Sequence, residues 1–234
     1  MQRPYFIPYT SGIGVEKKII DFKYYSGFTP IQKMKTIESF HNEIIKNDNN
    51  IKVLEISTKS NIDLGQKLSA FNLKSETINK RIPFTVETAF QSSKVFENGG
   101  PYIDLLYKNS KQAKTDERLK TSGKLISFRF LNKDYPIEPK TLFYDWLYIN
   151  VLEKNKELHK ELFQYNCFTD IEFNPAKSIN CQAHAVALFI SMKKNNLWRN
   201  IIHITKVRSQ HAVKPRHRLS NCYVDVRTGG QISN

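Results

Sequence analysis

The sequence predicts an α+β fold that is mainly helical, with a few short strands in one compact domain. Short runs of β-branched and aromatic residues are separated by longer segments whose apolar residues recur at helical spacing. The chain has 234 residues, of which 40% are hydrophobic and 12% aromatic, which is enough for a sizeable core. We expect the domain to span residues 1–205. A basic, loosely ordered tail is expected over 206–234, because it has few large apolar residues.

The N-terminal part predicts the order strand, helix, strand. Residues 19–25 and 51–56 are rich in β-branched and aromatic residues, which is typical of strands. Between them, Thr29 and Pro30 provide an N-cap and a first-turn proline. Apolar residues follow at helical spacing until the polar run at 47–50, where we expect the helix to end.

The middle of the chain predicts turns, two helices and a strand. Residues 64–73 form a turn-rich approach to a helix over 86–96, and the Gly-Gly-Pro run at 99–101 is expected to end that helix. A charged helix is expected over 110–122. The alternating pattern at 124–130 predicts a strand.

The C-terminal part is mostly helical. Residues 139–152 predict an apolar helix that starts at a proline, and 158–165 a short helix. Residues 168–175 are expected to be extended. The run 181–194 predicts an apolar helix with basic residues at its C-terminus, which suits the helix dipole. A last strand is expected over 201–207.

The chain is strongly basic, with a formal net charge of +14. Nine lysines and arginines but only one acidic residue lie between Lys193 and the C-terminus. This excess favours a polyanionic partner such as nucleic acid. A basic tail is also a common solubility feature, so charge alone leaves the partner open.

The spacing of the cysteines and the absence of several common motifs exclude some classes of protein. The three cysteines, Cys167, Cys181 and Cys222, lack zinc-ligand spacing, and a sparse, odd count indicates a reducing, cytoplasmic setting. Cys181 is expected to be a small buried residue; the alternative is a nucleophile close to His184. No run of eighteen apolar residues, secretory signal, P-loop, GxGxxG, HExxH or GxSxG motif occurs. We therefore expect no membrane span, no metal and no cofactor.

The first candidate site is a polar row in the segment 86–96. On a helix, Glu87, Gln91 and Lys94 would share one face at spacings i, i+4 and i+7. A carboxylate can stabilise positive charge at an anomeric carbon or activate water, and an amine with a lowered pKa can attack a carbonyl. Both chemistries suit cleavage of a ribosyl bond. The alternative is a solvated, salt-bridged helix face.

A second candidate set lies in the helix predicted over 139–152. Tyr144 and Tyr148 share one face, whereas Asp145 and Trp146 point elsewhere. Tyrosine or tryptophan can stack on a nucleobase. The alternative is that these rings belong to the core.

A third candidate set follows residue 168. If residues 169–173 are extended, Asp170 and Glu172 share a face and can act on a sugar or hold a metal. No nearby histidine supports a metal. Residues 178–181, which include Asn180, are typical of a helix N-terminus, where backbone N–H groups suit phosphate binding or ordinary capping.

Four ordered blocks of sequence resemble the NADAR family, and more closely its branch of DarT-associated antitoxins. The blocks are Leu-Ser-Ala-Phe-Asn-Leu at 68–73, the run from Val-Glu-Thr to Gly-Pro-Tyr at 86–102, the run 138–148 and the run 168–183. The Glu-x-x-x-Gln-x-x-Lys pattern is short, but four blocks in order make the resemblance fairly specific. It covers roughly residues 1–200 and not the tail.

The resemblance implies a mainly helical fold and an N-glycosidase activity on ADP-ribose linked to guanine. In that branch a toxin attaches ADP-ribose to guanine in DNA, and the NADAR protein removes it. The implied partners are therefore ADP-ribosylated DNA, ADP-ribose as product and a cognate DarT-type toxin. No cofactor is implied.

The resemblance also assigns roles to residues. The implied catalytic residues are Glu87, Lys94 and Asp170. The implied substrate-binding residues are Ser69, Phe71, Asn72, Gln91, Tyr102, Trp146 and Asn180. In this hypothesis Glu87 and Asp170 manage protons and charge at the anomeric carbon, and Lys94 attacks the opened sugar. Trp146 stacks on the guanine.

Two alternative functions stay open. One is an N-glycosidase acting on small ribosyl-amine nucleotides, as in riboflavin-pathway relatives. The other is a noncatalytic protein that binds a toxin or nucleic acid.

Overall fold

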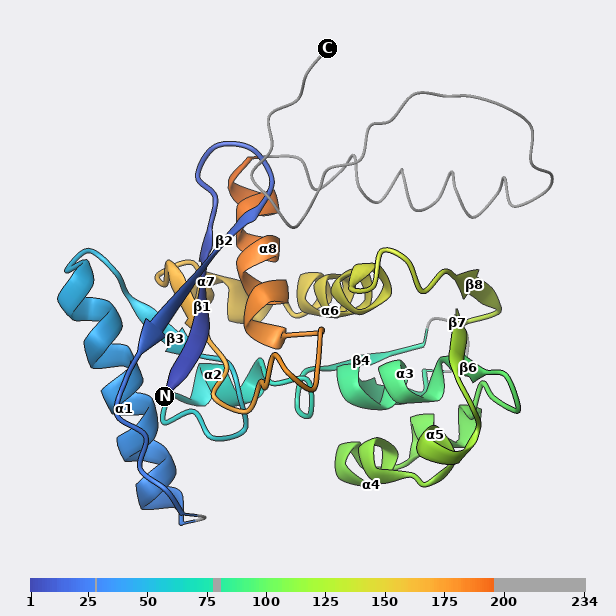
Figure 1. The fold of residues 1–234 in the computed structure, drawn as a ribbon. Helices are drawn as coiled ribbons and strands as arrows, with labels where there is room; N and C mark the ends of the chain where they lie inside the picture. Colours follow the sequence, from blue (N-terminus) through green and yellow to red (C-terminus); the bar gives the residue numbers. More distant parts are fainter. Residues whose placement is uncertain (28, 78–80, 196–234) are drawn as a thin grey trace.

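The computed structural model describes residues 1–27, 29–77 and 81–195 and has an α+β fold (Figure 1). Three small sheets, with strand orders β2-β1-β9-β3, β4-β5 and β6-β7-β8, are combined with helices. The predicted α+β class in a single compact domain is confirmed. The strand expected at 201–207 and the tail expected at 206–234 lie outside the described residues.

The four-stranded sheet combines three strands from the N-terminal part of the chain with β9 from its C-terminal part. Its strands are β1 (Gln2–Pro8), β2 (Val15–Asp21), β3 (Val53–Glu55) and β9 (Cys167–Thr169). β1 and β2 form an antiparallel hairpin, and β3 pairs with β9 in parallel. The strand predicted at 19–25 is wrong in its bounds, because it ends at Asp21, and β1 was not predicted. Two prolines in β1 weaken its sequence signal.

Helices cover both faces of this sheet. α1 (Pro30–Asn47) begins at the predicted N-cap, where Thr29 and Gln32 form a capping box. α1 buries Phe40 in a cluster with Tyr5, whereas the next residue of β1, Phe6, lies in the main core with α8 (Gln182–Lys194). In Figure 1 the sheet accordingly lies between α1 and α8.

The middle of the chain differs from the prediction at two helices. Its elements are α2 (Asp63–Lys67), β4 (Lys74–Glu76), β5 (Pro83–Thr85), α3 (Val86–Ser92), β6 (Lys94–Phe96) and the 3-10 helix η1 (Ile103–Tyr107). The helix predicted over 86–96 ends at Ser92. The N–H of Ser93 still donates to the carbonyl of Ala89, and the chain then leaves the helix because Lys94 pairs with Phe128 of the strand at 125–130. The Gly-Gly-Pro run lies in a later turn and does not end the helix.

The charged helix predicted over 110–122 is two short helices. They are α4 (Ser110–Thr115) and α5 (Arg118–Thr121). Asp116 separates them, because its carboxylate accepts hydrogen bonds from the backbone and the side chain of Arg118. The predicted strand at 124–130 is confirmed as β7 (Leu125–Phe130), and it forms a hairpin with β8 (Lys133–Tyr135).

The C-terminal helices are confirmed with shifted ends. They are α6 (Leu142–Lys154), the 3-10 helix η2 (Lys156–Leu158), α7 (His159–Leu162) and α8. α6 and α8 supply much of the main core, together with α3 and β9. These four elements meet around the candidate site.

Shortening Phe168 is expected to destabilise the fold. Phe168 in β9 is fully buried, so Phe168→Ala should lower the free energy of unfolding by about 3–5 kcal/mol through lost burial and an internal cavity. Urea denaturation followed by circular dichroism measures this change. The control is Ile19→Ala in β2, where the side chain is 63% exposed and the expected change is below about 1 kcal/mol. Equal losses in both variants would contradict this packing.

Candidate functional site

α3 places Glu87 and Gln91 inside the protein. The helix starts after Thr85, whose hydroxyl accepts the N–H of Thr88 in a capping box. Glu87 and Gln91 are only 6% and 7% exposed, and Nε2 of Gln91 donates to Oε1 of Glu87 at 2.8 Å. The expected i, i+4 contact is therefore confirmed. The alternative of a solvated helix face is wrong for these two residues.

Lys94 reaches the same region from a different element. It is the first residue of β6, so the prediction that it continues the helical row at i+7 is wrong. Its Nζ lies 4.9 Å from the ring centroid of Phe90. Burial lowers the pKa of Lys94; the charge of Glu87 opposes this shift and that of Lys114 adds to it. The result is an amine that loses its proton more readily than an exposed lysine.

Asp170 lies in a turn directly after β9. Its Oδ1 accepts the N–H groups of Glu172 and Phe173, each at 3.1 Å. The expectation of an extended segment over 168–175 is therefore wrong beyond Thr169. Asp170 and Glu172 do not share a strand face: Asp170 is 6% exposed, whereas Glu172 is exposed and accepts the hydroxyl of Thr58.

The surroundings of Asp170 favour its protonated form. Burial raises the pKa of Asp170 well above the usual carboxyl value, and the nearby charges of Glu55 and Glu172 raise it further. The hydrogen bonds from Glu172 N–H and from the Gln182 side chain oppose this shift. Asp170 is thus a carboxyl group that holds its proton to higher pH than usual.

Tyr144 of α6 is close enough to both carboxyl groups for their charges to affect its pKa. Its ring packs edge-on against Phe90, with centroids 5.1 Å apart. Burial raises the pKa of Tyr144, and the charges of Glu87 and Asp170 both add to this rise. Tyr144 is therefore near both acids. We call Glu87, Gln91, Lys94, Tyr144 and Asp170 the Glu87–Asp170 cluster.

The N-terminus of α8 lies next to Asp170. Cys181 is its N-cap, is buried as expected, and places Sγ 3.9 Å from Oδ2 of Asp170. Burial raises the pKa of the Cys181 thiol, with Asp170 adding to the rise, so the thiolate needed for a nucleophile is disfavoured. His184 lies 3.5 Å from Asp145, a contact between α6 and α8.

Two buried acceptor atoms of the predicted site residues have no donor. Within the described parts of the chain, no group donates to Oε1 of Gln91 or to Oδ1 of Asn180. Buried polar atoms in folded proteins are nearly always hydrogen-bonded, so an orphan acceptor marks a place where a water or a ligand is expected to donate. Both atoms belong to residues that the resemblance assigns to substrate binding.

The turn at 69–72 is tied to α8. The backbone N–H of Ala70 donates to Oε1 of Gln182 at 2.7 Å. Ser69 is buried and its hydroxyl donates to the carbonyl of Gln66. Asn72 is exposed, and its amide donates to the same carbonyl. The side chains of Ser69 and Asn72 thus have structural partners, whereas Phe71 is half-buried at the protein surface.

The structure does not bring Tyr102 and Trp146 into the cluster. The hydroxyl of Tyr102 contacts that of Ser122, and the Arg118 guanidinium lies 4.4 Å from its ring centroid. The Trp146 ring packs on Tyr135, with centroids 4.8 Å apart, and belongs to the periphery of the core. Tyr148 is fully buried and its hydroxyl donates to the carbonyl of Leu68, so the core interpretation of Tyr148 is confirmed.

Two residues next to the cluster were not singled out from the sequence. Glu55 is fully buried in β3 and accepts the Thr169 hydroxyl at 2.6 Å and the Ile171 N–H at 2.8 Å. Gln182 links Ala70 to Asp170. The only sequence signal for Glu55 is an acidic residue inside the apolar run 53–56.

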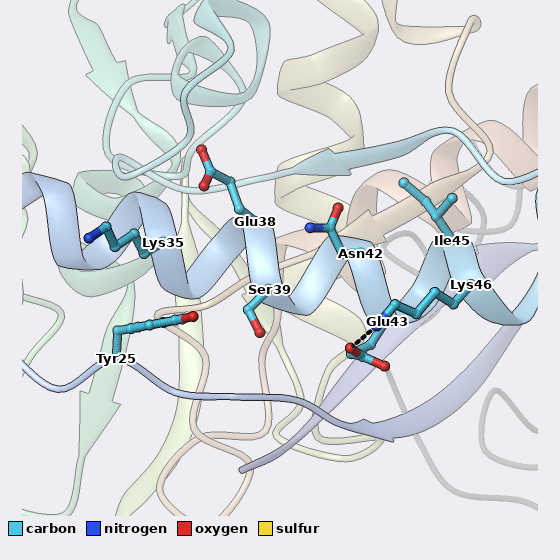
Figure 2. Close-up of a pocket in the computed structure, with 8 residues that line it drawn as sticks. All are labelled: Tyr25, Lys35, Glu38, Ser39, Asn42, Glu43, Ile45 and Lys46. Carbon is cyan, nitrogen blue, oxygen red and sulfur yellow. Dashed lines mark hydrogen bonds and ion pairs between the residues drawn. The ribbon is translucent and has the colours of Figure 1, made fainter.

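The protein surface has two hollows, and only the second is lined by predicted site residues. Figure 2 shows one on the exposed side of α1, with a volume of about 530 Å³, where Lys35 and Lys46 lie among Glu38 and Glu43. None of the predicted site residues lines it. The second hollow, of about 610 Å³, lies between the 69–72 turn, β5 and the start of α4, and Phe71 and Asn72 line it. We call this second hollow the α4 groove.

Metal and membrane features are absent from the part of the chain that the structure describes. No group of three or more His, Cys, Asp and Glu side chains there could hold a metal ion. No helix there has the length and apolar character that crossing a membrane requires.

Comparison with known proteins finds one family. A family model described as NADAR-DarT1, DarT1-associated NADAR antitoxin, matches residues 1–217. The match extends past residue 205 into the segment predicted as a tail. No curated protein matches the chain.

Replacing Asp170 is expected to change how stability depends on pH. Because the pKa of Asp170 is raised in the folded state, the unfolded chain ionises first as pH rises above the ordinary carboxyl value of about 4. The free energy of unfolding of the wild-type protein therefore falls as pH rises above about 4, because ionisation of Asp170 favours the unfolded chain. Asp170→Asn cannot ionise and keeps an acceptor for the two N–H groups, so its stability should fall less over this range.

Urea denaturation of wild type and Asp170→Asn at a series of pH values measures this difference. Glu157→Gln is the control, since Glu157 in η2 is exposed and is not among the charges that shift the pKa of Asp170, so it should leave the pH dependence close to that of wild type. Parallel curves for wild type and Asp170→Asn would mean that burial does not shift this carboxyl group.

Proposed function

Since the chain belongs to the family of DarT1-associated NADAR antitoxins, we propose that it is an N-glycosidase that removes ADP-ribose from guanine in DNA. NADAR proteins are generally ADP-ribosyl glycohydrolases. The association with a DarT1 toxin comes from the family. The chemistry at guanine is our proposal, and it would reverse the toxin's modification.

The observation that carries this proposal is the composition of the Glu87–Asp170 cluster. It combines two buried carboxyl groups, a half-buried amine and the orphan acceptor of Gln91. Asn180, which directly precedes the N-cap of α8, has a second orphan acceptor. Buried ionisable groups cost desolvation energy, and such groups with shifted pKa values concentrate at functional sites. The orphan acceptors fit the hydroxyl groups of a ribose, which are hydrogen-bond donors.

The proposed division of roles follows from the pKa shifts and the burial. Asp170, which favours its proton, is suited to protonate the departing guanine nitrogen or the ring oxygen. Glu87 is held in place by Gln91 and is suited to stabilise positive charge at the anomeric carbon. Lys94, whose amine more readily becomes neutral, is suited to act as the nucleophile.

The covalent steps balance without a cofactor. Opening of the ribose ring turns the bond between the anomeric carbon and a guanine nitrogen into an imine and protonates the ring oxygen. The Lys94 amine adds to the imine carbon and expels the guanine as its free amine, which leaves a lysine imine. Water then releases the aldehyde, and the sugar closes to ADP-ribose.

The basic charge of the chain supports a DNA substrate. A net charge of +14 favours a polyanion over a small nucleotide. The catalytic domain is proposed to span residues 1–205, as the sequence predicts. Trp146 is not proposed to stack on the guanine, because its ring packs on Tyr135.

Substitutions at Lys94 and Glu87 are expected to abolish turnover in a folded protein. Lys94→Ala and Glu87→Gln should each lower ADP-ribose release from a DNA oligomer carrying ADP-ribosylated guanine by about 10²–10⁴-fold. Chromatographic quantification of released ADP-ribose measures this. Lys120→Ala on α5 is the control, since Lys120 is exposed and lies outside the cluster.

A reducing agent that traps imines distinguishes a mechanism with a covalent lysine intermediate from direct attack by water. Cyanoborohydride added during turnover should link the sugar to Lys94, and mass spectrometry of the digested protein locates the link. Near-wild-type rates for Glu87→Gln would refute its assignment. Tight binding of a cognate toxin without any release of ADP-ribose would favour a noncatalytic protein that binds a toxin. Release of the sugar only from small ribosyl amines would favour an N-glycosidase that acts on small nucleotides.

The pH profile should be bell-shaped. The active form requires a neutral Lys94 and a protonated Asp170, whose pKa values are shifted down and up respectively. Both limbs of the kcat profile should therefore lie between the ordinary values of about 4 for aspartate and about 10.4 for lysine. Single-turnover rates across this range measure the profile. A rate that keeps rising up to the ordinary lysine value would contradict the lowered pKa of Lys94.

A further inference from the structure

The α4 groove carries uncompensated positive charge. Lys74, Lys108 and Lys111 line it, and no acidic residue does. Lys108 pairs with Asp116 at 3.1 Å, whereas Lys74 and Lys111 have no ion pair with any described residue. Two free ammonium groups beside one hollow suit the phosphates of a polyanion.

The groove also presents an aromatic ring to solvent. Tyr107, at the end of η1, is 65% exposed, which is a large fraction for an aromatic side chain. Phe71 lines the same groove and is half-buried. Exposed rings between basic residues are the usual platform for stacked bases of a single strand.

The floor of the groove is held by hydrogen bonds. The Ser110 hydroxyl donates to the Phe71 carbonyl at 2.8 Å and lies 2.8 Å from the Thr85 hydroxyl. These contacts join the 69–72 turn, the residue before α3 and α4. The groove is therefore built on the same elements that hold Glu87, so its position relative to the Glu87–Asp170 cluster is fixed.

The 69–72 turn connects the groove to the cluster: the N–H of Glu87 donates to the carbonyl of Ala70 at 2.9 Å, and the next residue, Phe71, lines the groove. Nζ of Lys114 lies 5.1 Å from the Phe71 ring centroid, and the charge of Lys114 is close enough to Lys94 to lower the pKa of Lys94. Lys114 lies one helical turn after Lys111 on α4, so lysines lead from the neighbourhood of Lys94 to the groove. A strand that follows these lysines from the cluster would enter the groove.

We propose that the α4 groove binds the DNA strand next to the modified guanine as a single strand, with Lys74 and Lys111 at its phosphates and Tyr107 stacked on a base. This inference rests on the proposed function, because the guanine held at the cluster delivers the strand to the groove. A base that enters a buried site must leave the duplex, so its neighbours are presented unpaired.

Binding of an unmodified oligonucleotide tests the groove independently of catalysis. Fluorescence anisotropy of a short, labelled single-stranded DNA is measured with the full chain over a range of salt concentrations. Lys74→Ala/Lys111→Ala should raise the Kd for every sequence and reduce the salt slope by about 1.4, that is about 0.7 for each lost phosphate contact. Tyr107→Ala should raise the Kd by about 5-fold or more.

The matched control removes two lysines from the other hollow. Lys35→Ala/Lys46→Ala alters the α1 surface of Figure 2, where two glutamates balance the charge, and should leave the Kd and the salt slope near those of wild type. An equal loss in both double variants, or an unchanged Kd in the groove variants, would overturn the proposal. The proposal would also be overturned if the groove substitutions raised the Kd for duplex DNA but not for single-stranded DNA.

Release assays distinguish failure of the groove from failure of the proposed function. The groove variants should keep the wild-type kcat on ADP-ribosylated guanosine and show a raised KM only on the modified oligomer. A lowered kcat on the nucleoside would overturn the assignment of these residues to the strand alone. If wild type releases ADP-ribose from neither substrate, the proposed function fails, while anisotropy still reports whether DNA binds the groove.

Discussion

Two buried carboxyl groups, those of Glu55 and Asp170, accept hydrogen bonds from the end of β9 and the turn after it, and the position of the candidate site depends on these bonds. Glu55 of β3 accepts donors from Thr169 and Ile171, the residues on either side of Asp170. Asp170 itself accepts two backbone N–H groups of the same turn. A buried acceptor without a donor costs about 1–3 kcal/mol, so these four bonds hold the turn in one conformation. The parallel pairing of β3 with β9 brings the two acids together.

This network extends to α1 through a histidine. Nε2 of His41 lies 2.8 Å from the Thr169 hydroxyl, and burial lowers the pKa of His41 to about 4. The imidazole is therefore neutral near pH 7, and because Thr169 donates to Glu55, Nε2 of His41 is the donor to Thr169. The sheet, α1 and the turn thus share one chain of hydrogen bonds. The candidate site is accordingly placed by buried polar contacts as well as by apolar packing.

Sequence reasoning recovers what local patterns determine. The capping signal at Thr29 and Pro30, the apolar runs of α6 and α8, and the contact between Glu87 and Gln91 all depend on neighbours within a few residues. What it misses depends on distant partners. Lys94 leaves the helical row because it pairs with Phe128 in the β6–β7 ladder. The extended segment expected after Thr169 becomes a turn because Asp170 accepts the next backbone N–H groups, and the role of Glu55 needs the β3–β9 pairing.

The placement of Glu87 on a helix and Lys94 on a strand limits how the length of this segment can vary. One residue inserted at Ser93 would leave α3 unchanged but would shift the β6–β7 register by one. Side chains alternate between the two faces of a sheet, so the amine would be carried to the opposite face from Glu87. The number of residues between Glu87 and Lys94 is therefore expected to stay constant wherever this pair of side chains is used.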